Sequence, residues 1–414
     1  MTFHHPRDAS GNDMKGMKEQ LALCGGPPVR STRLPYGRQW ITEEDVAAVV
    51  AVLRSDWLTT GPKVTELEEA FATTVGARHA VAVSSGTAAL HGAVAALGLG
   101  VGDEVIVPTL TFAASANCLV YQGATPIFAD VDPDTLLLSP TEAERLVTPR
   151  TRAILAVDYA GAPCDYHGLR EVATRYGLNL LADGCHALGA RRDDQPVGSL
   201  ADLTAFSLHP VKHITAGEGG MVTTDNPLSA QHLRLFRNHG ITTDHREREQ
   251  RGEWQYQMVE LGFNYRMTDI QSALALSQLH RLPDFLARRR AIAQRYHQAF
   301  ADIPGLSPLT VPAGAEHAYH LYVVRLHLDY LSVDRNTVLR ALRAEGIGAN
   351  VHYWPVHLHP YYQRTYHTGT GRCPVAEAAA HRILSLPLFP LMTDSDVEDV
   401  ISAVNKVLMA YAVY

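Results

Sequence analysis

The chain has 414 residues and a formal net charge of −7, and it is 46% hydrophobic and 19% charged. Its length exceeds what one ordinary core can bury, so we expect two domains. The mixed, mildly acidic charge argues against nucleic-acid partners, and no apolar run approaches the roughly 20 residues of a membrane helix. The five cysteines are scattered without a CxxC pair, which is typical of reduced thiols and predicts a cytoplasmic protein.

Residues 1–20 are polar and lack the apolar core of a signal peptide, so we expect a disordered extension over residues 1–25. Thr42, followed by three acidic residues, predicts the start of a helix. Further helices are predicted at Thr65–Val75, Thr87–Leu97, Ala113–Tyr121 and Tyr166–Tyr176. They alternate with short apolar strand candidates at Ala80–Val83, Glu104–Val107, Thr125–Ala129, Ala153–Val157, Leu178–Ala182, Leu203–Ser207 and Met221–Thr224. Such runs, separated by helices, indicate a mainly parallel sheet covered on both faces.

The pattern changes after Thr268. It predicts a helix from Asp269 to about Arg295 interrupted at Leu282-Pro283, a strand at His320–His327, a helix at Val333–Glu345, a strand at Ala349–Val351 and a last helix at Asp394–Met409. We therefore expect an α/β protein with a large domain over residues 26–285 and a smaller α+β domain over residues 286–414.

Two residues at predicted strand ends indicate chemistry, because sheets of this kind bind ligands beyond the carboxyl ends of their strands. Lys212 lies in a glycine-rich loop between two strand candidates. Partial burial there would favour its neutral amine, the form that condenses with an aldehyde. Asp183 follows an apolar strand and needs a positive partner, which a protonated pyridine nitrogen would supply.

Four other features are individually weak. Ser85-Gly86-Thr87 opens a helix and could bind a phosphate or only cap the helix. Phe112 could stack on a flat ring or lie in the core, and His186 could cover the ring or be structural. Ser207 ends the strand that precedes Lys212. In this order on successive strand ends, the set indicates pyridoxal phosphate (PLP).

The same segments resemble the DegT/DnrJ/EryC1/StrS family of nucleotide-sugar aminotransferases. The similarity runs from about Leu34 to the C-terminus, and it is carried by Ser85-Gly86-Thr87, Thr111-Phe112, Asp183-Gly184-Cys185-His186, the run from Ser207 to Lys212 with its Gly217-Glu218-Gly219-Gly220 tail, and Gly262-Phe263-Asn264-Tyr265-Arg266-Met267. The resemblance implies the PLP-dependent transferase fold type I, and a homodimer with active sites at the subunit interface.

The resemblance also implies residue roles. Lys212 would hold PLP covalently and move the proton, and Asp183 would pair with the pyridinium nitrogen. The catalytic residues would thus be Lys212 and Asp183 together with His186, which in this family is more often Gln. PLP would be bound by Gly86, Thr87, Phe112, Asp183, His186, Ser207, Lys212 and, from the neighbouring subunit, Asn264.

Four segments are more particularly similar to the transaminases of pseudaminic acid biosynthesis within this family: Ser207–Thr215, Val157–Gly161, Asn264–Leu274 and Val351–Val356. This similarity implies amino transfer from L-glutamate to the C4 ketone of a UDP-linked 4-keto-6-deoxy-N-acetylhexosamine. The nucleotide-sugar would be contacted by Tyr36, Asp56, Trp57, Leu58, Thr59, His352 and Tyr353.

Other functions stay open at this point. A sister enzyme could act on a GDP- or dTDP-linked keto sugar, and a PLP-fold regulator would be non-catalytic, although retention of Lys212 and Asp183 argues against it. A dinucleotide-dependent oxidoreductase is disfavoured because no GxGxxG follows the first strand. We expect no metal, because the histidines at 352, 357 and 359 lie in a proline-rich loop without an acid or cysteine.

Overall fold

The computed structural model describes residues 19–243, 248–249 and 252–413. Residues 1–18 of the predicted N-terminal extension lie outside the described residues. Residues 21–24, which fall within the same prediction, are folded: Leu21 is fully buried and Ala22–Cys24 forms a 3-10 turn, η1. Leu21 is ordered because it packs into the hydrophobic core of the C-terminal unit.

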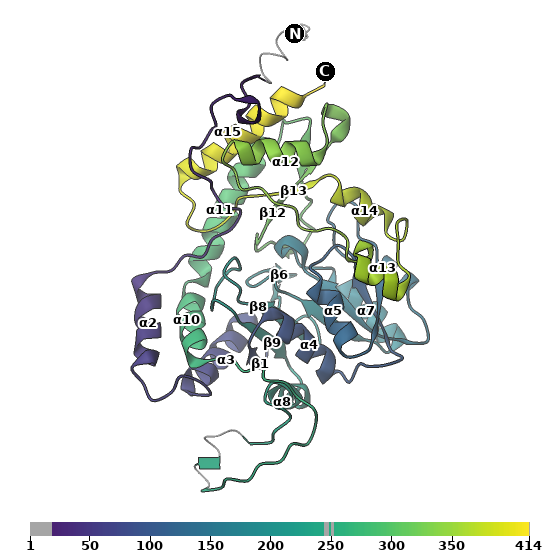
Figure 1. Cartoon of the computed structure of the whole chain (residues 1–414). Helices are drawn as coiled ribbons and strands as arrows, with labels where there is room; N and C mark the ends of the chain where they lie inside the picture. The colour runs from purple at the N-terminus through teal and green to yellow at the C-terminus, as the bar shows by residue number, and fades with distance from the viewer. Residues whose placement is uncertain (1–18, 244–247, 250–251, 414) are drawn as a thin grey trace.

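A seven-stranded sheet with the order β1-β9-β8-β5-β4-β2-β3 forms the centre of the larger unit (Figure 1). The strands from β8 to β3 in this order pair in parallel, whereas β9 runs antiparallel to both of its neighbours. Every strand predicted in the first part of the chain is present, and the mainly parallel sheet is confirmed. The strands are β1 His79–Val83, β2 Glu104–Pro108, β3 Thr125–Ala129, β4 Thr151–Val157, β5 Asn179–Asp183, β8 Leu203–Ser207 and β9 Gly220–Thr224.

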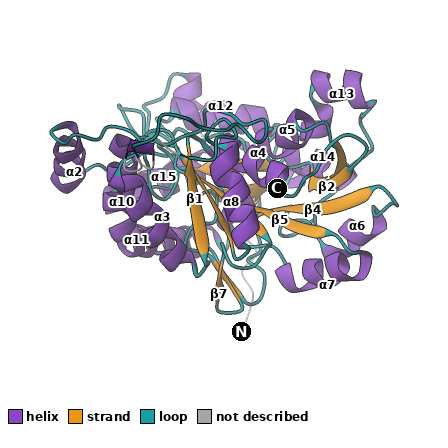
Figure 2. Ribbon diagram, turned by 90° about the horizontal axis from the view of Figure 1, so that it is seen from below, coloured by secondary structure: helices purple, strands orange, loops and turns teal. Residues whose placement is uncertain are grey.

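Helices cover both faces of this sheet, with α4 and α5 on one side and α6 and α7 on the other (Figure 2). The first helix begins where it was expected, because the Thr42 amide donates to the Asp45 carboxylate. Two helices that the pattern did not predict, α6 and α8, each start at a proline after a capping Ser or Asn. The helices are α2 Glu43–Leu53, α3 Pro62–Val75, α4 Gly86–Ala96, α5 Ala114–Tyr121, α6 Pro140–Arg145, α7 Tyr166–Tyr176 and α8 Pro227–Phe236.

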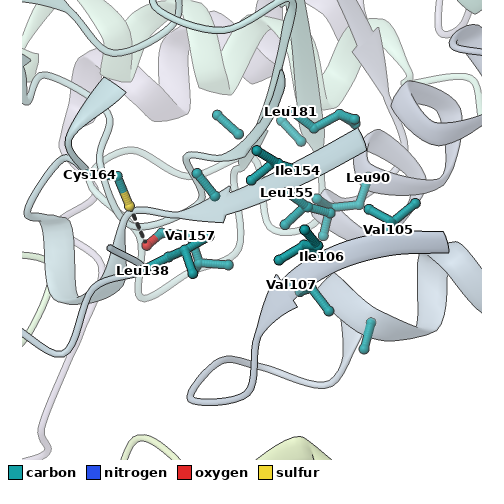
Figure 3. Packing of buried hydrophobic residues seen from close by; sticks show 14 of the residues in the cluster. Leu90, Val105, Ile106, Val107, Leu138, Ile154, Leu155, Val157, Cys164 and Leu181 are labelled. Atoms are coloured by element: carbon teal, nitrogen blue, oxygen red, sulfur yellow. Dashed lines mark hydrogen bonds between the residues drawn. The ribbon is translucent and has the colours of Figure 1, made fainter. Parts of the chain in front are cut away.

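The core between the sheet and its helices fixes the strand ends. Figure 3 shows Val105 and Ile106 of β2 packed beside Ile154 and Leu155 of β4, with Leu90 of α4 on the same cluster. All five side chains are at most 2% exposed, and burial of each contributes about 1.5–3 kcal/mol. The continuous apolar strands are explained by this double coverage.

The C-terminal unit is built on a three-stranded antiparallel sheet with the order β10-β12-β13. The predicted break at Leu282-Pro283 separates two helices, because Pro283 lies in the first turn of the second. The elements are α10 Asp269–His280, α11 Leu282–Phe300, β10 Leu306–Pro308, β12 Tyr322–Leu326, η3 Leu328–Tyr330, α12 Arg335–Ala344, η4 Val356–Leu358, α13 Pro360–Tyr366, α14 Pro374–Ala380, β13 Ile383–Leu386 and α15 Asp394–Tyr411. A smaller sheet joins β6 Arg191–Arg192, β7 Gln195–Pro196 and β11 Ala315–Glu316.

The predicted strand at Ala349–Val351 is wrong. Only Asn350 pairs with β13, through two backbone hydrogen bonds to Ser385. The ladder does not continue because the Ala349 amide donates to Ile347 instead, and Val351 lines a cavity. The third strand of this sheet is β13, which the pattern did not predict.

The segment from Leu21 to Leu34 lies against the C-terminal unit. The Glu345 carboxylate accepts from the amides of Ala22 and Val29 at 2.8 and 3.0 Å, and Leu34 forms a backbone bridge with Ile347. We therefore propose that the smaller domain includes residues 21–34 in addition to residues 286–414. Among the described helices, none has both the length and the apolar character needed to cross a membrane.

Candidate active site

A cavity of about 590 Å³ lies at the carboxyl ends of the central strands. Its walls come from the loops after β1, β2, β5 and β8 and from the segment around Val351, so the two units close it together. Most of the predicted site residues line this one cavity: Tyr36, Gly86, Thr87, Phe112, Asp183, His186, Ser207, Lys212, His352 and Tyr353.

The remaining predicted site residues do not line the cavity of their own chain. Asp56, Trp57, Leu58 and Thr59 lie between α2 and α3, where the Thr59 backbone pairs with Thr268. The exposed Asn264 forms a backbone bridge with Asn238, beyond the end of α8. A single chain therefore brings together the residues for the cofactor ring but not the whole predicted nucleotide-sugar set.

Lys212 lies in the loop between β8 and β9, which is fixed by backbone hydrogen bonds. The Lys212 amide donates to the His209 carbonyl at 2.9 Å. The Leu208 amide donates to the Gly219 carbonyl, and the Leu208 carbonyl accepts from the Ala216 amide. Burial lowers the pKa of the Lys212 amine, against the opposing effects of Cys185 and Asp183. Burial thus shifts the protonation equilibrium of Lys212 toward the neutral amine, which is the direction expected from the sequence.

Asp183 ends β5 and is 6% exposed. The Ser115 hydroxyl donates to its Oδ2 at 2.6 Å, and the Cys185 amide donates to its Oδ1 at 3.1 Å. Ser115 is in turn 2.7 Å from the hydroxyl of Thr111. Both hydrogen-bond donors to Asp183 are neutral, so the charge of the buried carboxylate is available to a cationic group in the cavity. Sequence reasoning missed Ser115, which lies in the first turn of α5, four residues after Thr111.

The start of α4 lines the cavity and has the features of an anion site. The Ser85 hydroxyl accepts from the Ala88 amide at 3.1 Å, while the amides of Gly86 and Thr87 belong to the first turn and have no partner within the helix. A Cβ on Gly86 would lie 2.8 Å from the Ser207 Cβ, so only glycine fits beside that strand. With the hydroxyls of Thr87 and Ser207 on the same cavity, this cradle suits a phosphate.

Aromatic and imidazole rings line another part of the cavity. His186 Nε2 is 3.1 Å from the Tyr353 hydroxyl, and burial lowers the pKa of His186 well below its usual range, so the ring is neutral. Burial also lowers the pKa of His352 to about 4, and its ring lies 5.1 Å from that of Tyr36. Phe112 is 58% exposed and 6.0 Å from the Tyr353 ring, so the alternative of a core phenylalanine is wrong.

Sequence reasoning missed several cavity residues. His209, Glu218 and Asn350 also line the cavity. Their closeness in sequence to predicted site residues could have indicated them, since His209 and Glu218 flank Lys212 and Asn350 lies two residues before His352. The predicted strand His320–His327 includes His320, but β12 starts only at Tyr322. His320 lines the cavity instead.

The histidines of the proline-rich loop have other partners. His357 lies between the Thr109 hydroxyl at 2.6 Å and the Glu377 carboxylate at 3.0 Å, whereas His352 is 2.8 Å from the Ser385 hydroxyl. Among residues 19–243, 248–249 and 252–413, no group of three or more His, Cys, Asp or Glu side chains is placed to hold a metal ion.

A lysine with a depressed pKa, a buried carboxylate with neutral hydrogen-bond donors and a glycine-dependent phosphate cradle meet at the strand ends of one α/β sheet. This combination defines a PLP-dependent transferase of fold type I, and the residues present fit the cofactor. The comparisons with known proteins narrow the class further.

Residues 39–405 match the model of the DegT/DnrJ/EryC1/StrS aminotransferase family, and the chain belongs to this family. It is 43% identical over 381 residues to the spore coat polysaccharide biosynthesis protein SpsC of Bacillus subtilis, covering 92% of this chain and 98% of that one. It is also similar to the PLP form of the putative sugar aminotransferase Spr1654 of Streptococcus pneumoniae, with a TM-score of 0.84, 34% identity and coverage of 91% and 98%. A third similar protein is Helicobacter pylori PseC, an aminotransferase involved in pseudaminic acid biosynthesis, with a TM-score of 0.86, 31% identity and coverage of 92% and 100%. The chain is thus a PLP-dependent sugar aminotransferase.

Proposed function

We propose that this enzyme transfers the amino group of L-glutamate to the C4 ketone of a UDP-linked 4-keto-6-deoxy-N-acetylhexosamine. The observation that carries the aminotransferase chemistry is that Lys212, Asp183 and the Gly86-Thr87 cradle line one cavity. The likeness to PseC supports the choice of sugar. The free state of all five cysteines supports a cytoplasmic enzyme.

PLP, when bound, supplies an aldehyde that takes up the donor's amino group and a pyridinium ring that accepts electrons from the donor Cα. In our proposal Lys212 would hold the cofactor through its Nζ. Once the donor amine is bound, the freed Nζ would accept the proton of the donor Cα and serve as the group that moves it during amino transfer. The lowered pKa of Lys212 suits this duty, because the free amine must be neutral to accept a proton.

Asp183 keeps the ring nitrogen protonated in this proposal. Its two hydrogen-bond donors, Ser115 and the Cys185 amide, orient both carboxylate oxygens without neutralising the charge. The amides of Gly86 and Thr87, with the hydroxyls of Thr87 and Ser207, bind the phosphate. His186 and Phe112 flank the ring, and Tyr36, His352 and Tyr353 contact the nucleotide-sugar near the ketone.

We further propose a homodimer in which each subunit completes the site of the other. The described parts of the chain between α8 and α10 extend away from the body of the molecule (Figure 1). Three of its apolar side chains are strongly exposed, with Trp254 at 86%, Leu261 at 78% and Met258 at 65%. Such exposure on one segment is typical of an interface. Asn264 lies at the base of this segment, which supports its proposed reach to the phosphate of the partner subunit, and we assign Asp56 to Thr59 to the shared site as well.

Subunit complementation tests the shared site. The Lys212→Ala and Asn264→Ala variants should each be nearly inactive alone. Mixed after dissociation and reassociation, they should recover about a quarter of wild-type activity, because half of random dimers are mixed and each holds one intact site. The control mixes Lys212→Ala with Asp183→Ala, which damage the same subunit's site and should recover nothing. Absence of recovery in the first mixture, with mixed dimers verified, would overturn the role of Asn264.

Half-reaction screening tests the substrate. The enzyme is first converted with L-glutamate to its pyridoxamine phosphate form, and single keto sugars linked to UDP, GDP or dTDP are then added. We expect the absorbance of the lysine-bound cofactor to return fastest with the UDP-linked 4-keto-6-deoxy-N-acetylhexosamine, by at least about 10-fold over the others, a difference of roughly 1.4 kcal/mol. A preference for a GDP- or dTDP-linked sugar would replace our proposal with the sister activity. A protein that shows neither cofactor absorbance nor any change with glutamate would be the non-catalytic regulator.

A further inference from the structure

Three buried imidazole rings lie in a row beside Lys212. The ring of His320 is 4.3 Å from that of His186 and 5.8 Å from that of His213, centroid to centroid. The outer two rings are held by hydrogen bonds, His186 to the Tyr353 hydroxyl and His213 to the Ala318 carbonyl, each at 3.1 Å. The Nδ1 atoms of all three rings are buried without a hydrogen-bond partner. His320 therefore contacts His186 by packing and not by a hydrogen bond.

The backbone on both sides of His320 is fixed. The Ala318 amide donates to the Gly161 carbonyl at 2.9 Å, and the Leu321 amide donates to the Ala160 carbonyl at 3.1 Å. On the other side the fully buried Arg289 donates to the carbonyls of Tyr319 and His320, at 3.1 and 3.4 Å, and to that of Leu388. The backbone that carries His320 is thus held by two separate elements, the turn η2 (Tyr159–Gly161) and α11.

Gly161 brings the loops of His186 and His320 together. Its φ is +104°, and a Cβ there would lie 2.7 Å from the His186 carbonyl oxygen and 3.0 Å from the His320 nitrogen. Real side chains do not tolerate such approach, so the backbone spacing between these two histidines depends on a glycine.

The row stays uncharged. Burial lowers the pKa of each of the three imidazoles well below its usual range, and Lys212 lowers each further whenever its amine is protonated. Arg289 adds to this effect at His213 and His320. Neutral rings can pack at 4.3 Å without charge repulsion, so His320 can serve as a rigid support for His186.

We propose that His320 is a positioning residue, whose ring fixes the orientation of the His186 ring where His186 flanks the cofactor. This inference rests on the proposed placement of the PLP ring beside His186. It adds a residue whose ring packs against that of His186 in the same cavity, and it assigns to Gly161 and Arg289 the task of holding the backbone of that residue in place.

The circular dichroism induced in the absorption band of bound PLP tests this proposal, because it reports how the ring is held and does not depend on turnover. Three variants are compared in the PLP-loaded dimer: His320→Ala, His320→Phe and His186→Ala. PLP affinity is measured in parallel by titration of the cofactor-free protein. His327→Ala is the matched control, because His327 is a half-buried histidine at the other end of β12 that bonds to Ser307 and does not line the cavity.

His320→Ala is expected to lower the induced signal by at least half, to weaken PLP binding about 3- to 10-fold and to lower kcat more than it changes KM. His320→Phe should restore most of the signal, because a flat ring supports His186 without nitrogen atoms, and His327→Ala should change nothing. If His186→Ala alters the signal but His320→Ala does not, the present inference fails while the proposed function stands. If His186→Ala also leaves the signal unchanged, the proposed placement of the cofactor ring fails. If His320→Phe is as damaging as His320→Ala, packing is not the cause and the inference is overturned.

Discussion

Replacing Lys212 with alanine is expected to abolish amino transfer while leaving the fold and the phosphate cradle intact. In our proposal the variant loses both the amine that holds the cofactor and the group that moves the proton from the donor Cα. General acid–base catalysis alone contributes about 10²–10⁴-fold, so we expect kcat to fall by at least about 10⁴-fold. The side chain is only partly buried and forms no ion pair among the described residues, so its removal should cost little stability.

The measurement combines turnover with cofactor binding. Lys212→Ala should still bind pyridoxamine phosphate, because the amides of Gly86 and Thr87 and the hydroxyl of Ser207 are untouched. Lys63→Ala is the control, since Lys63 is a half-buried lysine on α3 whose ammonium pairs with Glu66 outside the cavity, and its replacement should leave kcat unchanged. Substantial transamination by Lys212→Ala would contradict the assignment of Lys212 as the catalytic lysine.

Asp183→Asn should produce the second largest loss. The amide can keep hydrogen bonds with both Ser115 and the Cys185 amide, so the geometry of the site should survive. It carries no negative charge, however, and cannot hold a proton on the ring nitrogen. Removal of one preorganised electrostatic partner of this kind costs about 10²–10³-fold in kcat, and Asp183→Ala should lose at least as much because Ser115 would then also lack its acceptor.

Stopped-flow absorbance during the glutamate half-reaction measures this effect directly. Asp165→Asn serves as the control, because Asp165 is a carboxylate at the N-terminus of α7 that lies outside the cavity. A half-reaction rate for Asp183→Asn within about 3-fold of wild type would show that the pyridinium pairing is wrong.

The strands and their end residues could be read from the sequence because both are local. Each strand of the parallel sheet is a short apolar run, since helices cover both faces, and each run is bounded by turn or helix-start residues. The loops that follow these strands meet at one edge of the sheet by topology alone. Lys212, Asp183 and Gly86 could therefore be assigned to one site without knowledge of any distance.

Other features depend on contacts between distant residues and left little trace in the pattern. The segment after Leu21 is folded because the amides of Ala22 and Val29 donate hydrogen bonds to the carboxylate of Glu345, more than 300 positions away. Val351 follows a residue that pairs with β13, yet it lines the cavity instead of extending a strand. The proposed role of His320 follows from its ring lying against that of His186, which no spacing along the chain reveals.

The fold class, the family and the chemistry of the strand-end residues can be inferred from the sequence alone, because periodicity and motif order are properties of short stretches. The surroundings of each functional group depend on tertiary contacts. The tertiary structure buried the Lys212 amine enough to lower its pKa, and it gave Asp183 neutral hydrogen-bond donors. It also left Phe112 at the cavity and outside the core, and placed the ring of His320 against that of His186. Burial, desolvation and packing are set by residues brought together from the whole chain, so they exist only in the folded protein.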